Sequence, residues 1–582
     1  MSRSWFFEHP GNGTSHDDHD EDQAPGLTCI PAAVLQRHGA RVLDPSTAAA
    51  VPHARESGPG GRRASTPRST VYRARTLLIP ADLLRDTGVT RAISTVLARV
   101  GMSIAVPDTD LDNRLGHGDR RIAQLLERLP RAVVLVPAAP AEGRPALPVV
   151  IDAWVALQAL RAAAAVADQS AALREDVVRR ITLEHLLIAS SVINGSPSTE
   201  GNGVTGSPST EGNGVTGPSS TSSYGFSSGD TRAPVAISLP APRRRPAAEF
   251  GSRRPVVAVL DTGVRAHPWL DVKPYKSKKY ATTTDGFVQI DEDLQKAILK
   301  DTESVHDQGD HPRRLIRHPW DEPAIADPLV GELETTVGHS TFISGIVRQV
   351  APDAQVLAVR IMHSDGVVNE YDLIYAISRL AERVANAEAG DMTKMVDVVS
   401  LSLGYFDESS ADVKYGSGLW LAIEVLLSLG VTVVAAAGNF STRRHFYPAA
   451  FSTLPTPGPV PLISVGALNP NGTRALFSDG GRWVKAWAKG ASVVSTYPYD
   501  IRGHVSPPIK MKEREGLDSD DYSGGFAVWS GTSFAAPLLA AHIARQLLAD
   551  AEAGRGPGLD QLGDVAAMDR TMAALGELNW LG

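Results

Sequence analysis

A serine surrounded by small residues stands at the head of a long apolar pattern near the C-terminus of this 582-residue chain. Residues 530–537 read SGTSFAAP, and many Leu and Ala residues follow them. We expect Thr532 to cap a helix over residues 533–549, so that unpaired backbone N–H groups surround Ser533 in its first turn. Such groups can hold an oxyanion, and the pattern therefore predicts that Ser533 is a nucleophile.

A serine hydroxyl needs a base to take its proton and a third group to orient that base, and two upstream stretches supply these groups. Residues 255–264 (PVVAVLDTGV) form an apolar strand that ends in Asp261, and residues 338–347 (GHSTFISGIV) place His339 at the head of a helical pattern. Taken alone, these residues are a turn former, a buried helix residue and a helix cap. Their joint occurrence in the order Asp, His, Ser favours a catalytic triad.

The same order, with three further stretches, resembles the catalytic domain of subtilisin-like serine proteases over residues 255–549. Residues 396–404 (VDVVSLSLG) resemble the strand that lines the substrate cleft of that family. Residues 433–439 (VVAAAGN) resemble the strand that ends in its oxyanion-hole asparagine. The segments 446–449 (FYPA) and 463–467 (ISVGA) resemble its tyrosine-proline turn and the strand after it.

The resemblance implies a role for each matching residue. The implied site consists of Asp261, His339 and Ser533 as the triad, Asn439 in the oxyanion hole, and Ser402, Leu403, Gly404, Ala436, Ala437, Gly438 and Phe446 along the substrate cleft. Phe446 stands where the family has a small residue at the floor of its main specificity pocket. We therefore expect a preference for a small side chain before the cleaved bond. Ser340 and Leu538 also depart from the family pattern, and we expect them to alter packing only.

The alternation of strands and helices after residue 255 predicts an α/β fold with a subtilisin-like, mostly parallel sheet flanked by helices, and with the active site at the carboxyl ends of its strands. A small α/β domain and a flexible linker should precede it. The expected organisation is a disordered segment (1–70), a small α/β plus helical domain (71–193), a linker (194–250), the peptidase domain (251–549) and a C-terminal tail (550–582).

Residues 71–193 show three short strand patterns and two helical ones, followed by helical stretches around 150–168 and 171–190. The resemblance implies a propeptide here, and a permanent regulatory domain is the alternative. The linker contains GSPSTEGNGVT twice in succession, which is typical of a flexible chain. Arginines at 243–245 and 253–254, within residues 240–255, fit an exposed tether better than a processing site. If the front half is self-processed, we expect the cut between about residues 195 and 255.

Bulk properties exclude several classes of protein. A net charge of -8 without clustered Lys and Arg argues against nucleic-acid binding, and the single cysteine, Cys29, excludes an intrachain disulfide. The first ten residues have no apolar core of signal-peptide length, which predicts a cytoplasmic location. The apolar window from Leu419 to Gly438 contains Glu424 and Gly430, so it fits a buried helix and strand better than a membrane span.

No metal site is predicted. The acidic run at residues 16–22 lacks ligand spacing, as does the polar stretch 273–334, which contains His306, Asp307, His311 and His318 and which we expect to form a lid or binding loop. The chemistry needs no cofactor. Structural calcium is frequent in the family, but no ligand set can be carried over to this chain.

Together these features predict a serine endopeptidase that acts on protein or peptide substrates inside the cell. Its N-terminal domain should regulate it, with or without a partner of its own. One alternative is a protease fold that serves as a binding or assembly module with weak catalysis. The other is a protease exported by a route that the sequence does not show.

Overall fold

The computed structural model describes residues 4–7, 30–48, 67–105, 119–139, 149–166, 171–190 and 232–580, the last range with gaps at 237–238, 277–278, 284, 307–314, 323–324, 328–331, 389, 410–416, 502–509 and 516–520.

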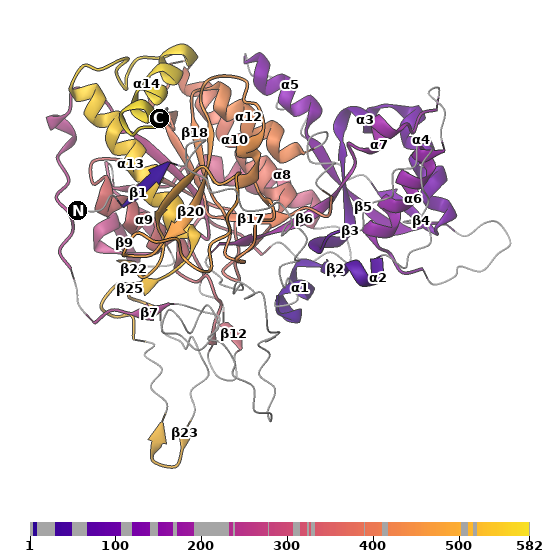
Figure 1. Cartoon of the computed structure of the whole chain (residues 1–582), viewed down its shortest axis with the longest axis horizontal. Helices are drawn as coiled ribbons and strands as arrows, with labels where there is room; N and C mark the ends of the chain where they lie inside the picture. Colours follow the sequence, from indigo (N-terminus) through magenta and orange to yellow (C-terminus); the bar gives the residue numbers. More distant parts are fainter. Residues whose placement is uncertain are drawn as a thin grey trace.

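An eight-stranded sheet forms the centre of the C-terminal part (Figure 1). Its strands, in spatial order, are β1 (Trp5–Phe7), β21 (Ala486–Lys489), β20 (Leu462–Leu468), β18 (Thr432–Ala436), β16 (Val398–Leu401), β8 (Val256–Asp261), β14 (Gln355–Arg360) and β11 (Val288–Gln289). Every neighbouring pair is parallel except β1 with β21.

Helices cover both faces of this sheet. They are α9 (His339–Val350) and α13 (Thr532–Glu552) on one face, and α10 (Glu370–Glu388) and α12 (Gly418–Ser428) on the other. Alternate residues of β8 belong to the two cores: Val257 and Val259 pack with α9 and α13, and Ala258 and Leu260 with α10 and α12. This double burial explains why the strand reads as a continuous apolar run. The predicted fold class is confirmed.

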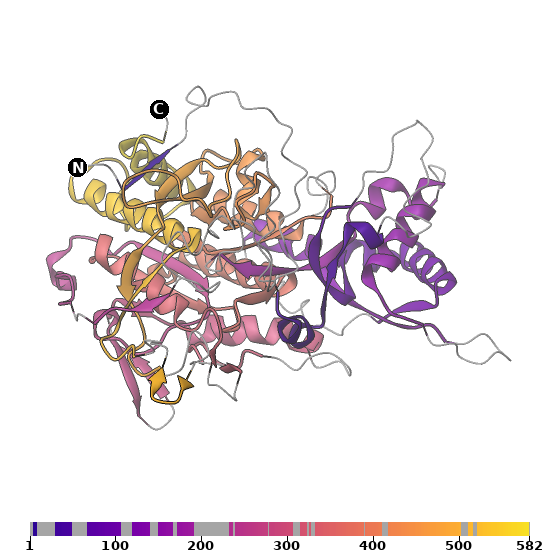
Figure 2. The same ribbon diagram turned by 60° about the horizontal axis from the view of Figure 1, so that its bottom comes forward.

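A second, antiparallel sheet joins the N-terminal part to the C-terminal part. Its strands are β19 (Phe446–Tyr447), β17 (Leu403–Phe406), β6 (Thr182–Ala189), β3 (Thr70–Pro80), β5 (Pro130–Pro137) and β4 (Met102–Ala105), with β15 (Val367–Asn369) beside β6 and β2 (Ala40–Leu43) beside β3. Figures 1 and 2 both show β6 reaching from the N-terminal part into the C-terminal part.

The helices of the N-terminal part are α1 (Ala32–His38), α2 (Pro45–Ala48), α3 (Ala81–Arg85), α4 (Thr87–Arg99), α5 (Arg120–Arg128), α6 (Ala153–Ala165) and α7 (Glu175–Val178). α6 packs on β3, and α4 packs on α6 and β4; buried side chains such as Ile93, Leu157 and Leu77 belong to one core. This part therefore has a core of its own.

The expected helix over residues 171–190 is wrong. Only the four residues of α7 are helical there, and Thr182–Ala189 form strand β6. The four-residue spacing of Leu173, Val177 and Ile181 reflects packing into the core of the N-terminal part rather than one helix. Pairing with β3, β15 and β17 decides the conformation of the segment that follows, and no local pattern reports such pairing.

The prediction of disorder before residue 70 is also wrong for the residues that the structure describes there. Trp5 and Phe7 lie on β1 with their side chains buried, and Phe7 packs edge-on against Trp580. α1, α2 and β2 follow in the same segment. Trp5 and Phe7 are two residues apart, so both point to the same face of a strand, and this strand forms by backbone pairing with β21 at the edge of the sheet.

Four of the arginines before β8, at positions 244, 245, 253 and 254, form ion pairs with the catalytic part. Arg245 pairs with Asp353 at 2.8 Å, and Arg253 pairs with Asp397 at 2.7 Å. The expected free tether is therefore wrong for residues 239–255, while the direct repeat lies outside the described residues. Arg244 and Arg254 lie 3.7 and 2.9 Å from Asp285, and a composition pattern cannot reveal such partners.

Part of the polar stretch 273–334 belongs to the body of the fold rather than to a lid. β11 extends the main sheet, and α8 (Glu292–His306) packs on α10 through the buried side chains of Leu294 and Ile298. Asp307 and His311 lie outside the described residues.

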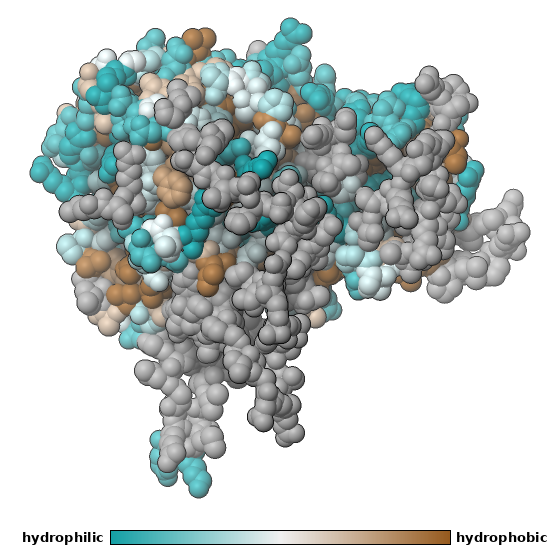
Figure 3. Space-filling view, viewed as in Figure 1, coloured by the Kyte–Doolittle hydropathy of each residue, from teal (hydrophilic) through white to brown (hydrophobic). Residues whose placement is uncertain are grey.

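The remaining elements are β7 (Ala233–Pro234), β9 (Val272–Lys276), β10 (Lys279–Thr282), β12 (Ile325–Asp327), β13 (Glu332–Leu333), β22 (Val493–Thr496), β23 (Lys510–Met511), β24 (Arg514–Glu515), β25 (Phe526–Trp529), α14 (Asp564–Glu577) and the 3-10 turns η6 (Ala247–Glu249), η7 (Pro268–Leu270), η8 (Met392–Lys394) and η9 (Ala449–Thr453). None of the helices in the described ranges has the length and apolar content needed to cross a membrane. On the face shown in Figure 3, hydrophilic residues cover most of the coloured surface.

Candidate active site

The carboxylate of Asp261 and the imidazole of His339 form a buried pair. Asp261 is the last residue of β8, and His339 is the first residue of α9. His339 Nδ1 lies 2.8 Å from Asp261 Oδ1 and 2.9 Å from Oδ2, and both side chains are fully buried. Because the carboxylate faces Nδ1, it favours a proton on that nitrogen and leaves Nε2 able to accept one.

The turn that delivers His339 depends on Gly338 and Asp321. Gly338 has φ 80°, and a Cβ there would lie 2.6 Å from Tyr497 Cε2. Its N–H donates to Asp321 Oδ2 at 2.8 Å, and burial raises the pKa of Asp321 to about 6. Sequence reasoning missed Asp321 because it lies in the polar stretch 273–334, where no motif distinguishes one acidic residue from another.

Ser533 lies in the first turn of α13, which packs against α9. The ring of the next residue, Phe534, lies 5.5 Å from the imidazole of His339. Ser533 Oγ donates a hydrogen bond to Ser402 O at 3.2 Å, and no atom of the described residues hydrogen-bonds His339 Nε2. The structure thus places the serine beside the Asp–His pair with its hydroxyl turned toward a backbone carbonyl.

The side-chain amide of Asn439 and the backbone N–H of Ser533 point at one oxygen atom. Asn439 Oδ1 accepts hydrogen bonds from Thr532 N and Oγ1, both at 2.9 Å, which fixes the orientation of the amide. Its Nδ2 donates to Ser190 O at 2.5 Å, and Ser533 N donates to the same oxygen at 3.1 Å. Gly531, not Thr532 as expected, is the N-cap of α13, which leaves the threonine hydroxyl for Asn439.

Strand β6 carries Ser190 to this place by pairing with two strands at once. It runs antiparallel to β15 on one side and to β17 on the other. Ser190 N donates to Ser402 O at 2.9 Å, and Ala189 N donates to Gly366 O at 2.8 Å. The register pairs Leu403 with Ala189 and Gly404 with Ile188. A segment of the N-terminal part therefore lies as an added strand against the predicted cleft residues 402–404.

The other predicted wall, Ala436–Gly438, is held inside the fold. Ala437 N donates to Val465 O at 2.9 Å, and a Cβ on Gly438 would lie 2.3 Å from Asp479 Oδ2. Asp479 is fully buried, and burial raises its pKa well above the usual range. No sequence signal points to Asp479, whose partners are backbone N–H groups of the loop after Asn439.

Phe446 fills the space between two glycines of the cleft. A Cβ on Gly404 would lie 2.4 Å from Phe446 Cε1, and a Cβ on Gly438 would lie 3.1 Å from its Cδ1. The ring is 1% exposed. Ser190, the residue whose carbonyl oxygen accepts from Asn439, itself has a small side chain.

Phe446→Ala should open this space and change the preference for the residue before the cleaved bond. We expect the unaltered chain to favour Ala over Phe there by at least about tenfold in kcat/KM, and the variant to lose that preference. Matched peptides that differ only at this residue provide the measurement. Phe451→Ala removes another buried ring next to Tyr447 and should leave the ratio unchanged. A strong preference for Phe in the unaltered chain contradicts the prediction.

The carboxyl edge of the parallel sheet carries a serine in the first turn of a helix, a histidine bonded to an aspartate, and two aligned N–H donors. This is the arrangement of a serine-hydrolase site. The sequence profile of the Subtilase family matches residues 252–553. This match covers more than half of the chain, which belongs to that family of serine proteases.

Similarity to individual proteins supports the family assignment. The chain is 28% identical to the Thermophilic serine proteinase of Bacillus sp. (strain AK1) over 247 residues, which is 42% of this chain and 46% of that protein. It is 32% identical to Subtilisin BL of Lederbergia lenta over 170 residues, which is 28% of this chain and 54% of that one. The chain thus spans about half the length of the curated relatives it matches.

Among solved structures, a mutant of the protease domain of PatA aligns over 57% of this chain and 98% of its own length. The identity is 18% and the TM-score is 0.33.

Proposed function

We propose that the chain is a serine endopeptidase whose N-terminal part occupies its own active site. The observation that supports this proposal most directly is the position of the Ser190 carbonyl oxygen. It accepts hydrogen bonds from Asn439 Nδ2 and Ser533 N, which is where the carbonyl of a bound substrate meets the oxyanion donors.

Each side chain then has a defined task. Ser533 Oγ attacks the carbonyl carbon, and His339 Nε2 accepts its proton and later gives it to the leaving amine. Asp261 orients the imidazole and stabilises its charged form. Rotation of the serine hydroxyl from Ser402 O toward His339 precedes attack, in keeping with the loose hydrogen bonds of resting sites.

The same geometry makes the N-terminal part an internal substrate and inhibitor. The strand that ends one residue before Ser190 is bonded to β15 and β17 as an extended substrate would be, so it excludes other peptides. The bond next to the held carbonyl joins Ser190 to Ser191. This bond lies upstream of the 195–255 region where the sequence suggested processing.

Intact-mass analysis of the unaltered chain beside Ser533→Ala tests the proposal. We expect the unaltered chain to give fragments 1–190 and 191–582 and the variant to stay whole. Ser190→Ala should still be cut, whereas Ser190→Phe should be cut more slowly because Phe446 leaves little room. Cleavage of the Ser533→Ala chain, or a first cut between residues 195 and 255, contradicts the proposed geometry.

A protease fold without useful catalysis predicts a different result. Such a module would keep the unaltered chain whole and would not react with a fluorophosphonate at Ser533, even after the N-terminal part is removed by an added protease. The cellular location, structural calcium and a partner for the N-terminal part stay predictions from the sequence.

A further inference from the structure

Two histidines and one aspartate converge where the N-terminal part meets the catalytic part. His38 is the last residue of α1, and His363 and Asp365 lie on the turn between β14 and β15. Asp365 Oδ2 is 2.9 Å from His38 Nε2 and 3.1 Å from His363 Nδ1. One ligand atom from each residue lies within 4.8 Å of the other two. His38 and Asp365 are buried, and His363 is half-buried.

The turn holds two of these side chains in a fixed arrangement. Gly366 N donates to His363 O at 2.9 Å, and His363 N donates to Val367 O at 3.2 Å. Val367 N also donates to Asp365 Oδ1 at 3.1 Å, which leaves Oδ2 directed at the histidines. Metal sites commonly use such outer hydrogen bonds to orient their carboxylate ligands.

The hydrogen bond to His363 favours a lone pair on the nitrogen that faces the carboxylate. The backbone N–H of Asp365 points at His363 Nδ1 at 3.2 Å, so Nδ1 acts as an acceptor. The same nitrogen lies 3.1 Å from Asp365 Oδ2, which is also an acceptor. A cation placed between the two atoms would be bound by both, and its bond to Nδ1 would replace the hydrogen bond from the Asp365 N–H.

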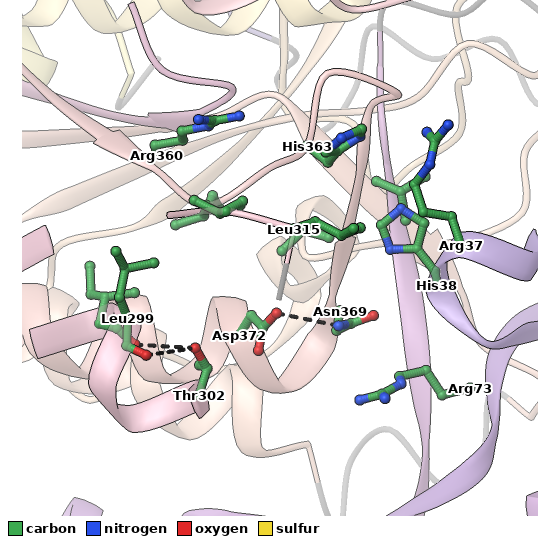
Figure 4. A pocket seen from close by; sticks show the side chains of 15 residues that line it. Arg37, His38, Arg73, Leu299, Thr302, Leu315, Arg360, His363, Asn369 and Asp372 are labelled. Carbon is green, nitrogen blue, oxygen red and sulfur yellow. Dashed lines mark hydrogen bonds between the residues drawn. The ribbon is translucent and has the colours of Figure 1, made fainter. Parts of the chain in front are cut away.

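A cavity gives an ion access to the cluster. Figure 4 shows Arg37, His38 and His363 gathered at one end of this cavity, while Leu299 and Thr302 lie at the other. The open side leaves room for a water molecule as a further ligand, which zinc accepts beside three protein ligands.

In the structure, Arg37 supplies the positive charge beside Asp365. Its Nη1 lies 2.6 Å from Asp365 Oδ2 and 2.7 Å from Glu334 Oε1. The side chain is 26% exposed and can turn outward. A metal ion would compete with this guanidinium for Asp365, and Glu334 would remain as a partner for Arg37.

A second group of three such residues, His185 with Asp407 and Glu408, does not share these features. Both ring nitrogens of His185 already face carboxylates, Glu370 at 2.7 Å and Glu408 at 3.0 Å. The ring is therefore a charged donor in an ion cluster, with no lone pair left for a metal.

We propose that His38, His363 and Asp365 bind a divalent transition-metal ion of the zinc class, which fastens the N-terminal part to the catalytic part. Imidazole nitrogens with one carboxylate oxygen form a ligand set that suits zinc rather than calcium or magnesium. Because ligands come from both parts, binding stabilises the state in which β6 fills the cleft. The binding itself does not depend on protease activity.

The test uses the full-length Ser533→Ala chain after removal of metals with a chelator. Titration calorimetry with zinc should show one ion per chain, with no competition from calcium or magnesium. Cobalt should give the visible absorption of a four-coordinate nitrogen and oxygen site. His38→Ala and His363→Ala should each weaken zinc binding by more than the about 10–100-fold that changes around a metal site cause. His318→Ala, which removes a half-exposed histidine paired with Glu322, should leave it unchanged.

Arg37→Gln separates a metal site from a simple ion cluster. If a metal competes with Arg37, this variant binds zinc more tightly than the parent chain. If an altered histidine variant unfolds, Asp365→Asn decides, since it keeps the shape of the side chain and should still weaken zinc binding. Absence of zinc binding, binding that survives His38→Ala, or weaker binding in Arg37→Gln would each overturn the proposal.

Discussion

We expect Asp261→Asn to lower the rate of the proposed cleavage after Ser190 by about 10⁴, a factor known for this change in another serine-protease triad. His339 Nδ1 lies between both carboxylate oxygens, at 2.8 and 2.9 Å. An asparagine presents one NH₂ group there, and that group donates to Nδ1. The imidazole proton then resides on Nε2, which can no longer accept the proton of Ser533.

Asp321→Asn is the matched control for this change. It alters another fully buried carboxyl close to the site, but one that accepts from the Gly338 N–H instead of facing the imidazole. An asparagine oxygen can accept the same hydrogen bond, so we expect less than about a tenfold change. The appearance of fragment 1–190 over time measures both rates. Similar losses in the two variants would contradict the role assigned to Asp261.

The candidate site residues could be proposed from the sequence because their positions follow from local pattern and chain order. Asp261 and Asn439 follow apolar strands, and such strands end at one edge of a parallel sheet. His339 is the first residue of a helix after Gly338, and Ser533 is the second residue of a helix after Gly531, which sets both at the same edge. The predicted alternation of strands and helices indicated only this edge of the sheet, and the roles proposed for the residues rested on the order Asp, His, Ser and on the family resemblance.

The occupant of the cleft was not predictable in the same way. Ser190 reaches Asn439 only because β6 is a strand, and its sequence, TLEHLLIA, reads equally well as a helix. The strand forms through pairing with β15 and β17, which lie far along the chain. Asp479 was missed for a related reason: its role depends on backbone N–H groups that no side-chain pattern marks.

The contact between β6 and the catalytic part contains a buried cluster of charges around His185. Its ring nitrogens face Glu370 of α10 at 2.7 Å and Glu408 at 3.0 Å, and it stacks on Tyr405 of β17 with ring centroids 4.4 Å apart. Arg161 of α6 lies 3.4 Å from the other oxygen of Glu408. The imidazolium is therefore the central positive charge between two buried carboxylates.

This cluster predicts that attachment of the N-terminal part depends on pH. Burial alone would lower the pKa of His185, but Glu370 and Glu408 outweigh it and raise that pKa well above 6.5. Burial alone would raise the pKa of Glu408, but His185 outweighs it and lowers that pKa from 4.5 to about 2. The contribution of His185 to the stability of this attachment is complete below pH 6.5. It is lost as pH rises through the pKa that the histidine has in the folded chain. The contribution of Glu408 to the same stability is complete above pH 4.5 and is lost as pH falls toward about 2. Attachment should thus be strongest from pH 4.5 to pH 6.5, where both contributions are complete.

His185→Gln in the full-length Ser533→Ala chain removes the positive charge and leaves two buried carboxylates without it. We expect the free energy of unfolding of the N-terminal part to fall by about 3–5 kcal/mol within the window of strongest attachment. The loss should shrink at alkaline pH, because the unaltered histidine is then neutral as well. Urea titrations at several pH values measure this difference, with His318→Gln as the control for an exposed histidine. A loss that grows at alkaline pH would show that the imidazolium does not hold β6 in the cleft.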